Sequence, residues 1–448
     1  MRSRVLTLLR AHGFNRTSFQ VLELGFRYWF CDEGCVAYSD TGSAWVAAGA
    51  PIASDAALSS VTRAFIAAGR ASGRRVSFFA TETRLLEAAA QELDTIQIGE
   101  QPVWDPASWA NIVKSSRSLR EQIRRARAKG VVVRQLDSVE VADRTHPARR
   151  AMEDLIARWL ATRAMAPMGF LVDVQPFDFP EERRYLVAER EGTIVAFLCA
   201  VPIYARSGWL IEDLVRHVEA PNGTGEMLID SAMRLLASEG SHDVTLGLAP
   251  LSGSVNRWLG AARSIGRALY DFRGVHAFKA KLKPDRWEPT YLAYPKGASP
   301  LLSVYDVLVA FARGSLSRFG LETVLRGPAF VVRTLAVLLV PWTILLASVE
   351  TRHWFPAPWV QWAWVGFDIV VMLGLFALSS RFRPRLARLL ASAITLDGML
   401  TLLEAVTFNV PRLRNQTDWL VVVIACLAPM GAAIVLWSAQ ATRYRAGS

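Results

Sequence analysis

Two pairs of charged residues have the types and the spacing that chemistry on a bound ligand requires. Asp213 and Arg216 are three residues apart at the end of an expected strand, Trp209–Val215. If the strand ends at Asp213 and the chain bends at Arg216, both side chains reach the crevice beyond the strand ends, where open α/β sheets bind ligands. The alternative is an ion pair that ties the strand to the next loop.

Lys279 and Lys281 form the second pair. They alternate on a segment that we expect to be a strand, so both would lie on one face of it. From there they could present two ammonium groups to a phosphate or to a developing oxyanion. A solvated strand face without a ligand is the alternative.

A basic segment precedes both pairs. Between residues 114 and 129 seven basic residues face one acid, Glu121, and most recur at spacings of three and four, which predicts a charged stripe along a helix. We expect this stripe to contact the phosphates of a nucleic acid; a plain solvated helix face is the alternative. The basic residues are Lys114, Arg117, Arg120, Arg124, Arg125, Arg127 and Lys129.

The order of the expected elements around Asp213 indicates the fold. A meander of strands leads to the loop Asn222-Gly-Thr-Gly225, a helix at Glu226–Ser238 and a strand at Asp243–Leu248. This order is the core of the acetyltransferase-like (GNAT) fold, in which such a loop and the helix N-terminus hold a pyrophosphate. Asn222, Gly223 and Gly225 are therefore candidate substrate-binding residues, although most such strings are ordinary turns.

The composition excludes a disordered chain and a disulfide scaffold. Of 448 residues 52% are hydrophobic and only 20% are charged, which is unusual for a wholly soluble protein. The net charge of +11 suggests a polyanionic partner, either nucleic acid or anionic lipid. The four cysteines and six histidines lack the spacing of a metal site, so we expect no metal.

The last part of the chain, 328–448, differs from the rest. It contains no lysine and holds four long apolar stretches, each near the roughly 20 residues that a membrane-spanning helix needs. Arginines before the first stretch, between the second and third, and after the fourth predict that both ends of this domain are cytoplasmic. The third stretch is equally compatible with a re-entrant or interfacial helix. The expected spans are Thr334–Val349, Ala357–Leu378, Leu389–Val410 and Trp419–Thr442.

Several motifs occur in a defined order over roughly residues 10–300. Together they resemble the C-terminal catalytic region of the multiple peptide resistance factor family, the lysyl- and alanyl-phosphatidylglycerol synthases. Two departures are Val215, where the family usually has Met, and the position of the membrane part, which precedes the catalytic region in the family and follows it here. The motifs are Asp213-Leu-Val-Arg216, Ala220-Pro-Asn-Gly223, Leu246-Gly-Leu-Ala-Pro-Leu-Ser252, Tyr270-Asp-Phe-Arg-Gly274, Phe278-Lys-Ala-Lys281 and Trp287-Glu-Pro-Thr-Tyr-Leu-Ala-Tyr294.

The resemblance implies a tandem pair of GNAT-like folds, an α/β arrangement, followed here by an all-α transmembrane domain of about four helices. It also implies transfer of an aminoacyl group from aminoacyl-tRNA to an anionic phospholipid, phosphatidylglycerol, a modification linked to antimicrobial peptide resistance. Asp213 would then hold the substrate ammonium or take the hydroxyl proton, and Arg216 would bind a phosphate. Ester exchange of this kind needs no nucleotide and no metal, so we expect no cofactor.

These expectations divide the chain into four parts. The first half covers 1–135 with the basic helix 114–129, the second half with the site covers 136–300, a linker covers 301–327, and the membrane domain covers 328–448. We expect a multi-pass protein of the bacterial inner membrane with a cytoplasmic catalytic region. Two other functions remain open: an acyl-CoA-dependent N-acyltransferase, and a non-catalytic lipid- or RNA-binding module attached to a transporter-like membrane domain.

Overall fold

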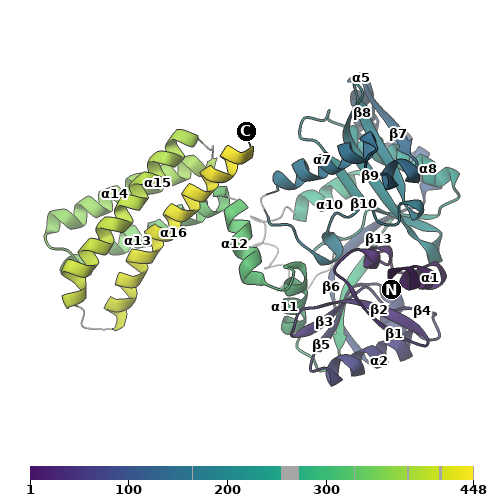
Figure 1. The fold of residues 1–448 in the computed structure, drawn as a ribbon, viewed down its shortest axis with the longest axis horizontal. Coiled ribbons are helices and arrows are strands. Elements are labelled where there is room, and N and C mark those ends of the chain that lie inside the picture. The colour runs from purple at the N-terminus through teal and green to yellow at the C-terminus, as the bar shows by residue number, and fades with distance from the viewer. Residues whose placement is uncertain (164, 254–271, 327, 381–382, 413–415, 447–448) are drawn as a thin grey trace. The chain divides into compact units, whose positions relative to one another are not determined.

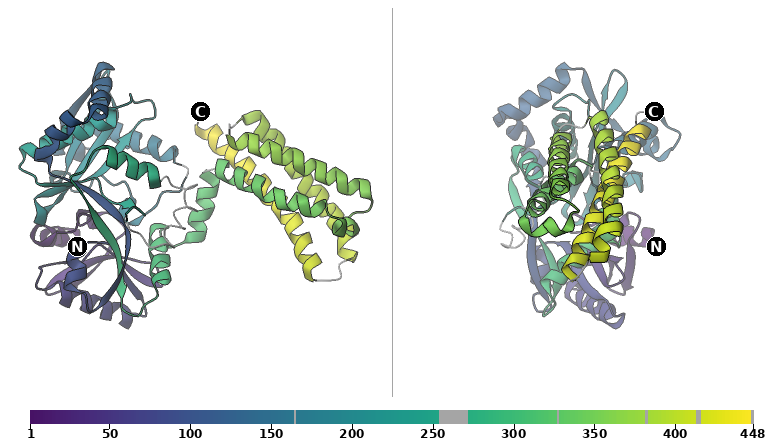
Figure 2. Two further views of the ribbon diagram at one scale, coloured as in Figure 1. Left: turned by 180° about the vertical axis from the view of Figure 1, so that it is seen from behind. Right: turned by 90° about the vertical axis from the view of Figure 1, so that its left-hand side faces the viewer.

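The computed structural model describes residues 1–448 except 164, 254–271, 327, 381–382, 413–415 and 447–448. The chain forms two compact units, shown in Figures 1 and 2. The α/β unit comprises Met1–Thr162 and Pro167–Leu316, and the helical unit comprises Arg163–Ala166 and Ser317–Ser448. The two units therefore separate within the expected linker.

The α/β unit is built on one mixed sheet. Its strands run side by side in the order β1-β2-β3-β5-β13-β6-β11-β10-β9-β8-β7, with β4 beside β2 and β12 beside β6. The strands are β1 Arg27–Cys31, β2 Gly34–Asp40, β3 Ala44–Ala48, β4 Ile52–Ala53, β5 Arg75–Thr81, β6 Leu93–Trp104, β7 Val131–Leu136, β8 Arg184–Arg190, β9 Thr193–Ile203, β10 Gly208–Arg216, β11 Asp243–Thr245, β12 Ala249–Pro250 and β13 Arg286–Pro295.

Helices cover both faces of this sheet (Figure 1). Each buries an apolar face with helical spacing; in α2, for example, Val61, Phe65 and Ile66 are buried and the opposite face is polar. The helices are α1 Arg2–His12, α2 Leu58–Ala71, α3 Thr83–Ala88, α4 Trp109–Ser115, α5 Arg117–Ala128, α6 Ser138–Ala142, α7 Pro147–Ala161, α8 Thr224–Ser238, α10 Phe272–Lys281 and α11 Pro300–Phe311.

The same topology occurs twice in the sheet. In the first half an antiparallel meander, β1 to β3, leads through α2 to β5, which is parallel to β3. In the second half the meander β8 to β10 leads through α8 to β11, which is parallel to β10. This order confirms the predicted α/β class and the acetyltransferase-like succession of meander, helix and parallel strand.

The two halves share strands, so neither has a complete sheet of its own. β13, at the end of the second half, lies between β5 and β6 of the first half, and β6 pairs in turn with β11 of the second. The predicted boundary at residue 135 places α5 and β7 in the first half. In the structure, α5 shares a hydrophobic core with α8 of the second half, and β7 pairs with β8. The α/β unit therefore depends on contacts that are distant in sequence.

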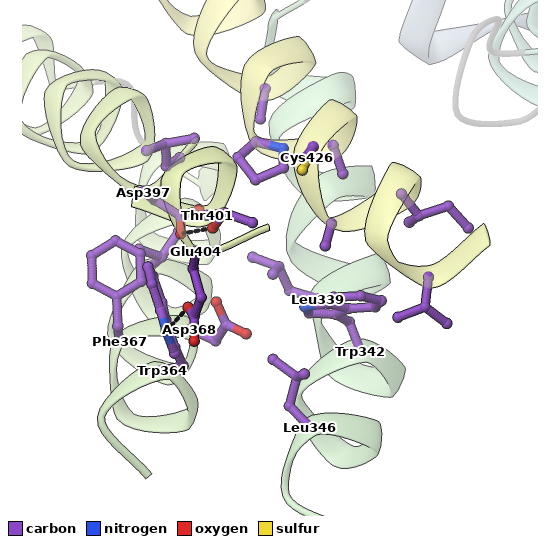
Figure 3. A pocket seen from close by; sticks show the side chains of 18 of the residues that line it. Leu339, Trp342, Leu346, Trp364, Phe367, Asp368, Asp397, Thr401, Glu404 and Cys426 are labelled. Carbon is purple, nitrogen blue, oxygen red and sulfur yellow. Dashed lines mark hydrogen bonds between the residues drawn. The ribbon is translucent and has the colours of Figure 1, made fainter. Parts of the chain in front are cut away.

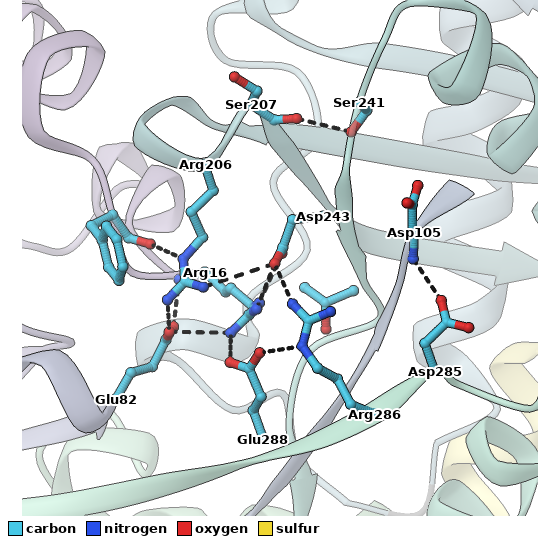
Figure 4. A network of polar contacts seen from close by, with 12 residues as sticks. Arg16, Glu82, Asp105, Arg206, Ser207, Ser241, Asp243, Asp285, Arg286 and Glu288 are labelled. Atoms are coloured by element: carbon cyan, nitrogen blue, oxygen red, sulfur yellow. Dashed lines mark hydrogen bonds and ion pairs between the residues drawn. The ribbon is translucent and has the colours of Figure 1, made fainter. Parts of the chain in front are cut away.

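A buried network of ion pairs joins the halves where they share strands (Figure 4). Its centre is Arg16, whose side chain is fully buried and whose guanidinium contacts Asp243 at 2.7 Å, Glu288 at 2.5 Å and Glu82 at 3.1 Å. Arg206 also pairs with Glu82, and a further arginine, 286, pairs with both Asp243 and Glu288. Three guanidinium groups thus face three carboxylates, and we call this set the balanced network.

The helical unit contains four long helices that run side by side (Figure 2). Two segments in its described part are long and apolar enough to cross a bilayer, Pro358–Leu378 and Arg385–Arg412, and two shorter apolar segments accompany them, Leu335–Leu346 and Val421–Trp437. The four helices overlap the four expected spans. The helices of this unit are α12 Leu316–Arg326, α13 Pro328–Leu346, α14 Pro358–Ser380, α15 Pro384–Glu404 and α16 Gln416–Ala446.

The helical unit is apolar outside as well as inside. Small and branched side chains such as Ala336, Leu375 and Ala391 form its core, while large apolar side chains lie exposed on its surface. A water-soluble bundle has a polar surface opposite its core, so this distribution suits a lipid environment. The exposed side chains include Trp359, Val370, Leu389, Leu403 and Leu427.

Candidate functional site

Asp213 lies on β10 at a β-bulge. Pairing with β9 shifts between Ile211 and Asp213, so Glu212 is the extra residue on β10. In a regular strand neighbouring side chains point to opposite faces, but a bulge re-aims a side chain. A carboxylate oxygen of Glu212, one of Asp213 and the sulfur of Cys199 consequently lie within 4.8 Å of one another.

A third acid comes from the other half of the α/β unit. Glu23 follows the short helix η1, Phe19–Leu22, and is only 2% exposed, while Asp213 is 7% exposed. Among the described residues, four buried oxygen atoms of Glu23, Glu212 and Asp213 accept no hydrogen bond from a nitrogen or hydroxyl donor, although the carboxyl groups of Glu23 and Glu212 are close enough to share a proton. We call these three residues the acidic cluster. Buried carboxylates without partners are costly, which points to a missing cation.

One guanidinium group faces the acidic cluster. The side chain of Arg183, only 1% exposed, pairs with Glu212 and donates to the sulfur of Cys199 at 3.6 Å and to the carbonyl of Asp178 at 2.8 Å. It also lies over the ring of Phe19. With all acids ionised, three negative charges would face one positive charge.

This imbalance changes the protonation of the acids. Burial, followed by the charge of Glu212, raises the pKa of Asp213 well above its usual value, although Arg183 acts in the opposite direction. The same two causes raise the pKa of Glu23 well above its usual value. Until a cation arrives, the cluster therefore tends to retain protons. It can release those protons when a cation binds.

The donor set suits an organic cation better than a metal ion. Cys199, Glu212 and Asp213 are close enough to share an ion, but burial raises the pKa of the Cys199 thiol and disfavours the thiolate that binds metals. Arg183 already occupies Cys199 and one carboxylate oxygen of Glu212, Oε2, while Oε1 of Glu212 stays unpaired among the described residues. An ammonium group needs only oxygen acceptors, which the acidic cluster supplies.

The acidic cluster lies where the sheet divides. β10 and β11 pair only from Gly208 to Leu210, whereas β10 continues beside β9 as far as Arg216. Beyond Leu210, β10 therefore pairs with no strand on its β11 side in the described part of the sheet.

Arg216 lies on the other face of β10 from Asp213. Val215, two residues after Asp213, packs in the core beside α7, while Leu214 packs in the core beside α5 and α8. Arg216, two residues after Leu214, is exposed on that second side. The structure shows no ion pair between Asp213 and Arg216, both of which it describes, so it does not bring the predicted pair together.

The prediction that Lys279 and Lys281 share one face of a strand is wrong, because both lie on helix α10. Lys279 is buried and donates to the carbonyl oxygens of Leu246, Gly247 and Leu248 at 2.8 to 2.9 Å. Burial lowers the pKa of Lys279 to about 7, and the three acceptors oppose this because only the charged amine can donate to all of them. Lys281 is exposed and lies 3.7 Å from Glu226 of α8. Lys279 thus holds the loop after β11.

Packing explains the glycine at the start of α8. Gly223 has a φ of +93°, and a Cβ atom there would lie 2.0 Å from the carbonyl oxygen of Gln122 on α5. Asn222 is exposed and Gly225 is half-buried. The close approach of two helices, rather than a phosphate, accounts for the left-handed glycine.

The basic segment forms helix α5 as predicted, with one interruption. Ser116 caps the N-terminus of α5, accepting a hydrogen bond from the N–H of Leu119, so Lys114 belongs to the preceding helix α4. Leu119, Ile123 and Ala126 form the buried face. The seven basic side chains are exposed, and Arg124 pairs with Glu121 on the surface.

Comparison with known proteins gives a family. Residues 7–294 match the family model described as "Phosphatidylglycerol lysyltransferase, C-terminal". The chain belongs to this family. The phosphatidylglycerol lysyltransferase of Bacillus subtilis (strain 168) is 37% identical over 128 residues, which cover 27% of this chain and 14% of that protein. The LysX bifunctional protein of Mycobacterium avium (strain 104) is 25% identical over 219 residues, 45% of this chain and 18% of that protein. The matched region thus spans less than a fifth of either relative.

Solved structures share the fold of this lysyltransferase-family chain. The C-terminal domain of a putative lysylphosphatidylglycerol synthetase from Agrobacterium fabrum has a TM-score of 0.61 at 23% identity, covering 70% of this chain and 98% of that domain. L-PGS from Bacillus licheniformis has a TM-score of 0.59 at 22% identity, covering 69% and 96%. At these identities the likenesses show the fold alone.

Three residues of the site in this family member were not anticipated from the sequence: Glu23, Arg183 and Glu212. Glu212 is the direct neighbour of Asp213, but the alternation of a regular strand assigns it to the opposite face. Glu23 and Arg183 are remote in sequence, and only the fold brings them to β10.

Proposed function

We propose that the α/β unit transfers an aminoacyl group from aminoacyl-tRNA to a hydroxyl group of a membrane phospholipid, phosphatidylglycerol. The observation that carries this proposal is the acidic cluster, in which three buried acids face one guanidinium beside the point where β10 and β11 stop pairing. An aminoacyl ester carries an ammonium group beside its reactive carbonyl, and an uncompensated buried carboxylate is the group that recognises it.

The reaction exchanges one ester for another. The lipid hydroxyl oxygen bonds to the aminoacyl carbonyl carbon, the bond from that carbon to the ribose oxygen breaks, and the hydroxyl proton ends on the ribose oxygen. In this proposal Glu23 and Glu212 hold the ammonium and thereby position the carbonyl, since orientation is a large part of such a rate enhancement. Asp213, which lies at the bulge, takes the hydroxyl proton and returns it to the ribose.

The charge of the cluster favours a lysyl group over an alanyl group. With its acids ionised the cluster has three negative charges and the one positive charge of Arg183. Two negative charges are then in excess. A lysyl ester carries two ammonium groups and would neutralise both, whereas an alanyl ester carries one and would leave one negative charge buried.

The charge of α5 and the apolar surface of the helical unit indicate two further partners, tRNA and the membrane. The exposed arginines of α5 would contact tRNA phosphates, and the apolar surface of the helical unit would anchor the chain in the bilayer. We propose four spans with both ends of the membrane domain in the cytoplasm of a bacterium. Reporter fusions after Ser448 should then indicate cytoplasm and a fusion near Arg352 the opposite side; a cytoplasmic signal near Arg352 would contradict this topology.

An acyl-CoA-dependent transferase is the competing function. It would need the loop at Asn222–Gly225 for a pyrophosphate, but at Gly223 the backbone of α5 lies in close contact. A non-catalytic module would not need buried acids without partners. The observations therefore favour aminoacyl transfer over both.

Reconstitution tests the proposal. Purified full-length protein in vesicles that contain phosphatidylglycerol is supplied with [14C]lysyl-tRNA, [14C]alanyl-tRNA or acetyl-CoA, and the lipids are separated by thin-layer chromatography. The expected result is a labelled, ninhydrin-positive phospholipid with lysyl-tRNA, and a loss of roughly 100-fold or more in rate for Asp213→Asn. Glu226→Gln, which removes a carboxylate on α8, is the matched control and should retain activity. No labelled lipid with either tRNA, or full activity of Asp213→Asn, would refute the proposal.

A further inference from the structure

The helical unit encloses a cavity of about 360 Å³ that no part of the proposed transfer reaction uses. Side chains of α13, α14, α15 and α16 line it, most of them apolar (Figure 3). Its size is within the range of small-molecule sites. Rings of Trp342, Trp354 and Trp364 form part of the wall.

Three acids interrupt this apolar lining. Asp368 comes from α14, and Asp397 and Glu404 come from α15, two turns apart on one helix face (Figure 3). Thr401 donates to Asp397 at 3.4 Å, and Trp364 donates to Glu404 at 3.0 Å. Among the described residues that line the cavity there is no Lys, Arg or His. The described lining of the cavity thus contains carboxylates but no positively charged side chain.

Asp368 lacks the partner that a buried carboxylate needs. It is 6% exposed, and its Oδ2 atom has no hydrogen-bond partner among the described residues, as is also true of Oε1 of Glu404. Acids inside an apolar helical bundle are expensive and occur where they bind or conduct something. The unpartnered oxygen at the cavity wall therefore indicates a positively charged ligand.

We propose that this cavity binds a cationic amphiphile, a molecule with a primary ammonium group on an apolar body. The carboxylates would accept hydrogen bonds from the ammonium, and tryptophan faces attract cations. The apolar walls would take up the body of the molecule. A ligand of this kind is either an amine-bearing lipid of the membrane or a free cationic surfactant. The site stands independently of the transfer reaction in the α/β unit.

Binding measurements with the full-length protein in phosphatidylglycerol nanodiscs test the site. The probe is dodecylammonium, with dodecanol as the neutral probe of the same length, and the readout is the change in tryptophan fluorescence. Dodecylammonium should bind at least roughly tenfold more weakly to Asp368→Asn than to the unmodified protein, because charged hydrogen bonds are lost. Dodecanol should bind both proteins equally, which also shows that the variant retains its cavity.

Two controls complete the test. Glu322→Gln, on α12 and outside the cavity lining, should bind dodecylammonium like the unmodified protein. If the natural ligand is a membrane lipid, lysyl-phosphatidylglycerol added to the nanodiscs should compete with dodecylammonium. If the site takes only free amphiphiles, the added lipid should leave the affinity for dodecylammonium unchanged. Equal affinities for dodecylammonium and dodecanol, or an unchanged affinity in both Asp368→Asn and Glu404→Gln, would overturn the proposal.

Discussion

The α/β unit contains two buried groups of charges that differ in one respect. In the balanced network three guanidinium groups meet three carboxylates, and Arg16 alone contacts Glu82, Asp243 and Glu288. In the acidic cluster, Arg183 is the guanidinium that faces three acids, and four oxygen atoms accept no hydrogen bond from a nitrogen or hydroxyl donor among the described residues. The first group is complete within the protein and the second is not. Complete pairing indicates a structural role, and the missing charge indicates a ligand.

The two groups also respond differently to pH. Burial opposes ionisation of Glu288, but hydrogen bonds from Arg16 and Arg286 lower its pKa below the usual value. Its contribution to stability is therefore present above pH 4.5 and is lost on acidification. The pKa values of Glu23 and Asp213 are raised instead. The folded state then holds protons that the unfolded state has lost, so their contribution to stability decreases as the pH rises above about 4.

Removal of the central arginine of the balanced network should have the largest effect on stability. Arg16→Ala leaves three carboxylates facing only two guanidinium groups, and we expect a loss of about 3–5 kcal/mol in the free energy of unfolding. Urea denaturation measures it. Arg10→Ala is the control, since Arg10 pairs with Glu182 at the surface and such exposed pairs contribute little to stability. Equal, small losses in both variants would show that the network is not structurally important.

Neutralising an acid of the acidic cluster should raise the free energy of unfolding instead of lowering it. Glu23→Gln removes a buried carboxyl group whose ionisation the fold opposes, so we expect the variant to be more stable at pH 8 by about 0.5–2 kcal/mol. The gain should disappear near pH 4, where Glu23 is protonated in both states. Thermal unfolding across this pH range measures it. Asp243→Asn, in the balanced network, should be destabilised at pH 8; a loss of stability in both variants would remove the distinction between the two groups.

Charges on the surface should affect binding and leave stability unchanged. Arg117 and Arg127 are exposed on α5, so replacing both with Ala should change the free energy of unfolding by less than about 0.5 kcal/mol. If they contact tRNA phosphates, the slope of log affinity against log salt should decrease in magnitude by up to about two. Filter binding of tRNA at several salt concentrations measures this slope. An unchanged slope would make α5 an ordinary surface helix.

Local patterns were sufficient to predict part of this structure. The α/β class, the succession from the meander through α8 to β11, the helix with the basic stripe and the four long helices of the helical unit follow from periodicity and turn residues. Lys279 shows the limit of such patterns. Alternation over four residues does not distinguish a strand from a helix, and here it belongs to α10.

The site itself depends on contacts that no local pattern reports. A bulge brings Glu212 to the same place as Asp213, and a segment nearly 190 residues earlier supplies Glu23. The insertion of β13 between β5 and β6 is likewise a long-range pairing. The motif around Asp213 identified one acid, and only the fold showed that this acid belongs to an uncompensated group.

The most direct test of that missing charge is the number of protons released when a cation binds. Calorimetric titration of the full-length protein with L-lysine methyl ester at pH 7, in two buffers of different ionisation enthalpy, gives this number. If the acidic cluster binds the ammonium groups, its acids must ionise, so protons should be released on binding and fewer should be released by Glu23→Gln. N-acetyl-norleucine methyl ester, which has no ammonium group, should not bind. Binding of the lysine ester without proton release, or equal proton release by Glu23→Gln and the unmodified protein, would contradict the account.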